Sequence, residues 1–125
     1  MKFYLDQLFY PHHADQWDDL ILRDRINTEL EKDHIVLDFG AGRGNVKAMD
    51  LSKKCAMSIG VDVDKAVLNN PYLDRAHLIH DHVLPFEDNF FDLVISDNVF
   101  EHVEDPCSVM REIGRVMKSG ANLIF

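Results

Sequence analysis

Apolar residues recur along this 125-residue chain in two alternating patterns, which together predict one α/β domain. Short apolar runs bounded by glycine, proline or acids predict five strands, at residues 35–39, 56–63, 76–79, 91–96 and 121–125. Apolar residues at spacings of three and four predict helices at residues 15–32 and 106–117, and shorter helices at 46–53 and 64–68. Strands and helices that alternate at this spacing indicate a parallel sheet covered on both faces.

Capping residues predict where these helices begin and end. Asp15, Asn45 and Asp64 are suited to the N-cap position, because their side chains can accept hydrogen bonds from the first turn. Asp105-Pro106 combines an acid at the N-cap with proline at the first helical position. Asn70-Pro71 ends the helix over residues 64–68. Residues 118–120 (KSG) are expected to close the last helix before the fifth strand.

Three glycines at alternate positions follow the first predicted strand, after the acid Asp38. Gly40, Gly42 and Gly44 would weaken either a strand or a helix, so the spacing indicates a backbone with positive φ or a ligand too close for a Cβ atom. A strand that runs through such a loop into a helix is where α/β folds hold a nucleotide-like cofactor.

Acids also follow the other strands of the predicted sheet. Asp62 ends the second strand, Asp81 follows the third, and Ser96-Asp97 follow the fourth. Each acid alone could be a turn former or a helix cap. Because the carboxyl ends of parallel strands share one edge, the acids together indicate a binding site, in which Asp62 would accept hydrogen bonds from ribose hydroxyls.

Two ligand classes fit this edge, dinucleotides and S-adenosylmethionine. The dinucleotide fingerprint has its third glycine three positions beyond the second, where this chain has Asn45. Asp38 would repel a pyrophosphate, whereas it would tolerate the cationic groups of S-adenosylmethionine. A nicotinamide-dependent oxidoreductase therefore stays the second interpretation.

Composition restricts the partners and the location. A formal charge of −9 argues against a nucleic-acid-binding surface. Two cysteines, Cys55 and Cys107, are too few for a disulfide scaffold and indicate reduced thiols. The first residues show no signal peptide, and no apolar run has the ~20 residues of a membrane helix. We therefore expect a cytoplasmic domain without a membrane partner.

Residues 36–44 (VLDFGAGRG) resemble the first motif of class I S-adenosylmethionine-dependent methyltransferases. Residues 60–63 (GVDV) are similar to their second motif. Residues 81–86 (DHVLPF) and 90–94 (FFDLV) resemble the third-strand turn and fourth strand of the small-molecule branch, and the likeness continues through residues 98–103 (NVFEHV) to the end. The resemblance implies a Rossmann-like sheet in the order 3-2-1-4-5.

The resemblance also implies a role for each matching residue. Gly40 and Gly42 would let the backbone approach the methionine and ribose, and Asp38 would help to hold the amino group. Asp62 would accept both ribose hydroxyls. The remaining implied contacts are Val63 on the adenine ring, Asp81 and the His82 backbone at the adenine edge, and Ser96 or Asp97 at the methionine end.

Methyl transfer depends mainly on placing the acceptor in line with the reactive methyl group. His102 is the best-placed candidate base, and a histidine that only orders its loop is the alternative. His77, His80 and His82 alternate along a strand, which exposure explains as well as metal binding, so no metal is expected. The acceptor implied by the resemblance is a small molecule.

The predicted organisation is an N-terminal arm and helix over residues 1–33 and a cofactor-binding core over 34–125. Family members continue past the fifth strand to two more, so we expect a core without strands 6 and 7. This expectation supports a third interpretation, a non-catalytic module that binds a cofactor or a partner.

Overall fold

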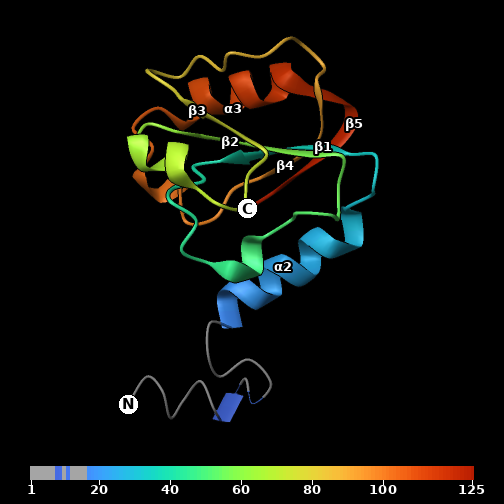
Figure 1. Cartoon of the computed structure of the whole chain (residues 1–125). Coiled ribbons are helices and arrows are strands. Elements are labelled where there is room, and N and C mark those ends of the chain that lie inside the picture. Colours follow the sequence, from blue (N-terminus) through green and yellow to red (C-terminus); the bar gives the residue numbers. More distant parts are fainter. Residues whose placement is uncertain (1–7, 10, 12–16) are drawn as a thin grey trace.

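Five strands pair in parallel in the order β3-β2-β1-β4-β5, and this sheet organises the domain (Figure 1). The computed structural model describes residues 8, 9, 11 and 17–125. The predicted N-cap Asp15 and most of the predicted N-terminal arm lie outside these residues. The strands are β1 (Ile35–Phe39), β2 (Met57–Asp62), β3 (Arg75–Leu78), β4 (Phe91–Ile95) and β5 (Met117–Ile124). The predicted fold class and strand order are confirmed.

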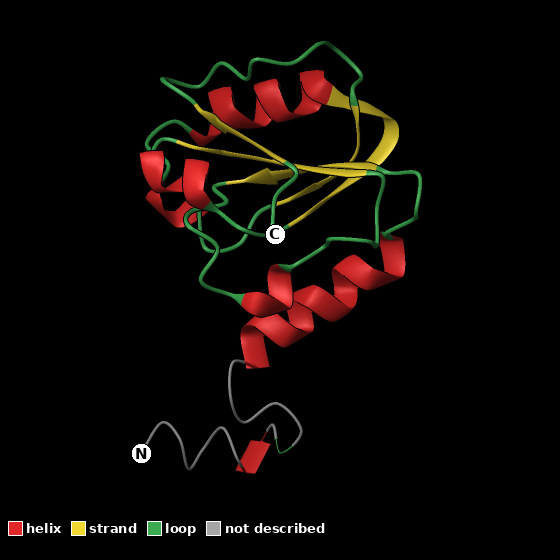
Figure 2. Cartoon of the chain, viewed as in Figure 1, coloured by secondary structure: helices red, strands yellow, loops and turns green. Residues whose placement is uncertain are grey.

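One helix covers each face of the sheet (Figure 2). Neighbouring residues of a strand point to opposite faces, so Val36 and Leu37 of β1 enter different cores. Leu37 belongs to the core beneath α3 (Pro106–Val116), which contributes Ile113. Val36 belongs to the core beneath α2 (Trp17–Glu29), which contributes Ile26. No helix among the described residues is long and apolar enough to cross a membrane.

The segment after the glycine loop forms one short turn instead of the predicted helix over residues 46–53. The 3₁₀ helix η1 (Lys47–Met49) begins after Val46, and the predicted cap Asn45 makes no cap. Asp50 ends the turn, because its carboxylate accepts a hydrogen bond from the Ser52 amide at 2.9 Å. The next 3₁₀ helix, η2 (Lys65–Asn69), begins as predicted at Asp64, which accepts from the Ala66 amide at 2.8 Å.

The prediction for the end of α3 is wrong. Asp105 caps the helix as expected, but the helix ends at Val116 and β5 begins at the next residue, Met117. Residues 118–120 lie in β5, where the pairing with β4 shifts register and Gly120 has a φ of +83°. An ion pair of 2.6 Å between Lys118 and Asp92 holds this irregular stretch to β4.

Candidate functional site

Two adjoining cavities lie at the carboxyl edge of the sheet. The larger has a volume of about 620 Å³ and the smaller about 240 Å³. Gly40, Asp97 and Asn98 line both, so the two form one elongated site. Of the predicted site residues, the larger cavity is lined by Gly40, Asp62, Val63, Asp81, His82, Asp97 and His102. The smaller is lined by Asp38, Gly40, Gly42 and Asp97.

Ser96 is the one predicted site residue that lines neither of these cavities. Its side chain is buried, and its hydroxyl donates a hydrogen bond of 2.9 Å to the Phe39 carbonyl. This bond joins the carboxyl ends of β4 and β1. Its neighbour Asp97 is the residue of the pair that faces the site.

The glycine loop follows β1 and is bound along one side to the end of β2. Gly40, Gly42 and Gly44 have φ values of +78°, +55° and +76°, which explains why glycine occupies alternate positions. The amides of Gly40 and Ala41 both donate to the Val61 carbonyl, at 2.9 and 3.1 Å. The loop therefore turns sharply at the sheet edge instead of continuing the strand.

Asp62 connects this loop to the second strand through both carboxylate oxygens. Oδ2 accepts a hydrogen bond from the Gly42 amide, and Oδ1 accepts from the Asp64 amide, each at 2.9 Å. A carboxylate oxygen has two acceptor positions, so each oxygen keeps one for a further donor. Two backbone amides thus fix the orientation of Asp62 while it lines the larger cavity.

Asn70, which the sequence pattern predicts only as a helix end, lies at the site. Its side-chain amide donates to the carbonyls of Ala41 and Gly42, at 3.0 and 3.1 Å. It lines the smaller cavity, as do Asp38 and Asp97. These hydrogen bonds join residues almost thirty positions apart in the sequence. The only local signal for them is that an asparagine precedes Pro71.

The smaller cavity is lined by two acids with raised pKa values, Asp38 and Asp97, and by Arg43. Burial, reinforced by Asp97 and Asp62, raises the pKa of Asp38 to about 7. Burial raises the pKa of Asp97 to about 6, and Asp19, Asp18 and Glu101 add to this shift. Among the described residues, no hydrogen bond or ion pair relieves the Asp38 carboxylate. A ligand with a cationic group would restore the charged form of both acids.

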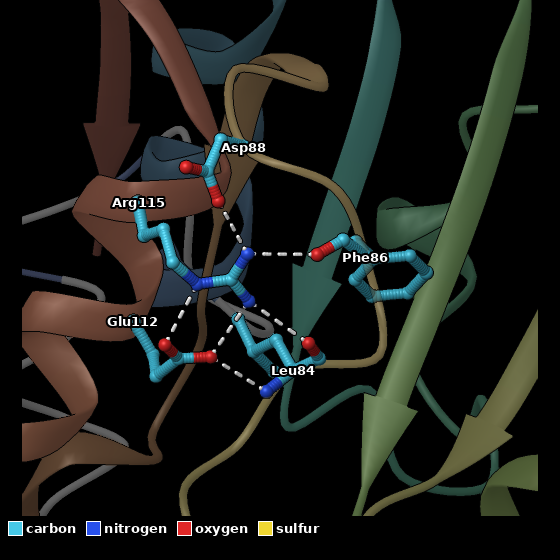
Figure 3. A network of polar contacts seen from close by, with 5 residues as sticks. All are labelled: Leu84, Phe86, Asp88, Glu112 and Arg115. Carbon is cyan, nitrogen blue, oxygen red and sulfur yellow. Dashed lines mark hydrogen bonds and ion pairs between the residues drawn. The ribbon is translucent and has the colours of Figure 1, made fainter.

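A loop anchored to α3 follows the Asp81-His82 corner of the larger cavity. Arg115 donates to the carbonyls of Leu84 and Phe86, at 3.0 and 2.8 Å, and to Asp88 at 2.8 Å (Figure 3). Glu112 accepts from Arg115 and from the Leu84 amide, both at 2.8 Å. The loop carries few regular backbone bonds, so this network sets its path.

The histidines of the third strand do not gather into one site. His77 packs edge-on against Phe86, with ring centroids 5.3 Å apart, whereas His82 lines the larger cavity. In the described part of the chain, three potential metal ligands come together elsewhere, at Glu31, Asp33 and His34 before β1. His102 lines the larger cavity with an exposed side chain, and its Nε2 atom lies 4.0 Å from Glu101.

A parallel α/β sheet with a glycine loop after β1 and a carboxylate at the end of β2 defines a nucleotide-cofactor domain. The comparison with protein families is specific: residues 37–125 match a methyltransferase domain. The chain therefore belongs to the class I S-adenosylmethionine-dependent methyltransferases, whose cofactor is S-adenosylmethionine.

Individual relatives agree with this assignment. The chain is 31% identical over 99 residues to the ubiquinone biosynthesis O-methyltransferase of Hahella chejuensis, covering 72% of this chain and 41% of that enzyme. It is 31% identical over 119 residues to the sarcosine/dimethylglycine N-methyltransferase of Halorhodospira halochloris, covering 80% and 39%. The crystal structure of the YcgJ protein from Bacillus subtilis superimposes with a TM-score of 0.67 and 30% identity, covering 78% and 45%. The chain thus spans less than half the length of each.

The residues of the site fit S-adenosylmethionine. The cofactor is elongated and carries a sulfonium and an ammonium group, and the smaller cavity offers the carboxylates of Asp38 and Asp97. Arg43 also lines this cavity, but no ion pair among the described residues joins a cation to Asp38. A Cβ atom added to Gly42 would meet no atom within 4 Å, so this glycine faces open space at the cavity. Asp62 presents fixed acceptors to the larger cavity.

Proposed function

We propose that this domain binds S-adenosylmethionine along the two adjoining cavities and transfers its methyl group to a small-molecule acceptor. The observation that carries the proposal is the convergence of Asp38, Asp62, Asp81 and Asp97, from the ends of four parallel strands, on one elongated site. Folding alone does not require four carboxylates around one cavity, because like charges at short range destabilise the folded state.

Each part of the site has a task under this proposal. Asp62, held by the amides of Gly42 and Asp64, accepts hydrogen bonds from the ribose hydroxyls. Asp38 holds the amino group in the smaller cavity. The exposed side chain of Val63 and the Asp81-His82 corner contact the adenine in the larger cavity.

The bound cofactor supplies an electrophilic methyl group on sulfur. The protein then contributes chiefly by orienting the acceptor, which can account for ~7–11 kcal/mol of the barrier. Where the acceptor must lose a proton, His102 lies at the cavity wall with an exposed imidazole that takes it up. Glu101 faces Nε2 at 4.0 Å, which leaves Nδ1 as the ring nitrogen that accepts the proton.

A third cavity, of about 280 Å³, is the place that we propose for the acceptor, and its lining indicates the charge of that acceptor. Leu22 of α2, Phe100 and Phe125 form its apolar walls, and Asp97 connects it to the cofactor cavities. Asp97 and Glu101 are its charged residues, and none of the described residues that line it is lysine or arginine. We therefore propose an acceptor that is neutral or cationic, with an apolar part. The two curated relatives are named for O- and N-methyl transfer, which is consistent with a small acceptor.

Calorimetric titration separates this proposal from the nicotinamide alternative. We expect S-adenosylhomocysteine to bind and NADH to show no heat of binding, and the opposite result would overturn the proposal. Incubation with methyl-labelled S-adenosylmethionine and a small-molecule extract, followed by ion exchange, then tests the acceptor. Label is expected in the cationic or neutral fraction. Label confined to the anionic fraction would contradict the acceptor class, and cofactor binding without any labelled product would favour the non-catalytic module.

A further inference from the structure

We infer that Asn70 is the positioning residue of the glycine loop, which sets the loop geometry needed for cofactor binding. The effect on cofactor affinity rests on the function proposed above. Asn70 lies at the end of η2, thirty residues beyond Gly40, and its contacts are made with backbone atoms of the loop.

The Asn70 side chain makes three hydrogen bonds at once. Nδ2 donates to the carbonyls of Ala41 and Gly42, at 3.0 and 3.1 Å, and Oδ1 accepts from the Tyr72 amide at 3.0 Å. Both amide hydrogens and the oxygen are therefore used. The backbone amide of Asn70 also donates to the Val67 carbonyl at 3.0 Å. A side chain fixed in this way can hold the loop without itself moving.

The glycine loop is hydrogen-bonded on two sides, to the end of β2 and to Asn70. The amides of Gly40, Ala41 and Gly42 all donate toward β2, to the Val61 carbonyl and the Asp62 carboxylate. Asn70 binds the carbonyls of Ala41 and Gly42. It therefore holds the peptide groups on both sides of Gly42, and the Gly42 amide points at Asp62. Without Asn70, these peptides could rotate and Asp62 would lose one of the two donors that orient it.

Gly44 packs so closely against Asn70-Pro71 that no side chain fits there. A Cβ atom at this position would lie 2.4 Å from Oδ1 of Asn70 and 2.9 Å from Cδ of Pro71. The third glycine of the loop is thus required by the close approach of Asn70-Pro71. Hydrogen bonds and close packing therefore independently join the glycine loop to Asn70-Pro71.

The test compares Asn70→Asp with Asn69→Asp, which adds the same charge to the exposed neighbouring residue. In Asn70→Asp the acceptor for the Tyr72 amide is kept, but the two donors become an anionic oxygen facing two carbonyls. We expect S-adenosylhomocysteine to bind about tenfold or more weakly to this variant, as measured by calorimetry. Asn69→Asp should stay within twofold of the unmodified protein. Asn70→Ala, which removes the donors without adding charge, should show a smaller loss in the same direction.

A spectroscopic measurement distinguishes positioning from general stability. The Gly42 amide proton, bound to a carboxylate, should resonate downfield and exchange slowly in the unmodified protein and in Asn69→Asp. Both features should be lost in Asn70→Asp at a temperature where circular dichroism shows a folded domain. An unchanged Gly42 resonance in Asn70→Asp would overturn the inference, and so would an affinity of this variant for S-adenosylhomocysteine within twofold of the unmodified protein. Unfolding of both Asn70 variants would overturn it as well. If the unmodified protein does not bind S-adenosylhomocysteine, the proposed function fails, and the Gly42 signal still decides the role of Asn70.

Discussion

The backbone amide of Gly42 lies 2.9 Å from Oδ2 of Asp62, and this hydrogen bond joins the glycine loop after β1 to the end of β2. The two residues are twenty positions apart in the sequence. The segment between them contains a turn, the 3₁₀ helix η1 and the strand β2. Because the second oxygen of Asp62 accepts from the Asp64 amide, the carboxylate is oriented before any ligand arrives. Preorganised acceptors bind a diol without the entropic cost of ordering the side chain.

Replacement of Asp62 by asparagine should weaken S-adenosylhomocysteine binding by about tenfold or more, because charged acceptors make the stronger hydrogen bonds. Calorimetry measures the change. Asp64→Asn is the matched control: it removes the same charge two residues away, and asparagine caps a helix as well as aspartate does. Equal affinities for the two variants would contradict the role proposed for Asp62.

The buried acid Asp38 should make the stability of the ligand-free domain fall as pH rises. Its pKa is about 7 in the folded protein and 3.8 in the unfolded chain, so the folded state binds the proton more tightly. Its contribution to stability is complete below pH 3.8 and is lost as pH rises through about 7. Asp38→Asn should therefore raise the free energy of unfolding at pH 8 by about 1–4 kcal/mol.

Urea unfolding at pH 5 and pH 8 measures this difference. The increase for Asp38→Asn should be larger at pH 8, whereas Glu87→Gln, at an exposed loop position, should change neither value. The same Asp38→Asn variant should bind S-adenosylhomocysteine more weakly, because its amino group loses a carboxylate. A variant that is less stable than the unmodified protein at pH 8 would refute the electrostatic argument.

Two glycine-to-alanine substitutions should act in opposite directions. Gly44→Ala places a Cβ atom 2.4 Å from Asn70 at a φ of +76°, so we expect a loss of about 1–3 kcal/mol in unfolding free energy. Gly114→Ala lies in α3, where an added Cβ atom meets nothing within 4 Å, and should stabilise by about 0.5–1 kcal/mol. Thermal and urea unfolding of both variants test the contrast, and a neutral Gly44→Ala would argue against the close packing of the loop.

The network around Arg115 should lose stability in acid. Arg115 lowers the pKa of Glu112 to about 2, from an ordinary value of 4.5. The contribution of this carboxylate to the stability of the fold is therefore present above pH 4.5 and is lost as pH falls through about 2. Arg115→Met should lower the thermal midpoint by several degrees at pH 7 and by less at pH 2, where about half of Glu112 is protonated.

Limited proteolysis locates this effect in the molecule. Cleavage should increase within residues 84–88, the loop that Arg115 anchors (Figure 3). Arg111→Met on the exposed side of α3 is the matched control and should leave the cleavage rate unchanged. Equal cleavage of both variants would show that other contacts hold the loop.

The sequence by itself determined the strands, their parallel arrangement and the edge at which the site lies, and the resemblance to methyltransferases implied the strand order. Apolar runs, caps and glycine spacing are local signals, and the topology of a parallel sheet brings together the acids at the carboxyl ends of β1, β2 and β4. Asp64 and Asp105 were predicted as caps for the same reason, because the bonds of a cap join residues two or three positions apart.

Only the tertiary structure decided which of these residues face the site and what holds them there. Ser96 turns its hydroxyl to Phe39, 57 residues away, and Asn70 binds loop carbonyls 28 and 29 residues away. The predicted end of α3 was wrong because Met117 pairs with Phe91 of β4, so β5 begins directly after the helix. The raised pKa of Asp38 depends on its burial beside Asp97 and Asp62. Such features follow from contacts between distant segments, which no local pattern of residues encodes.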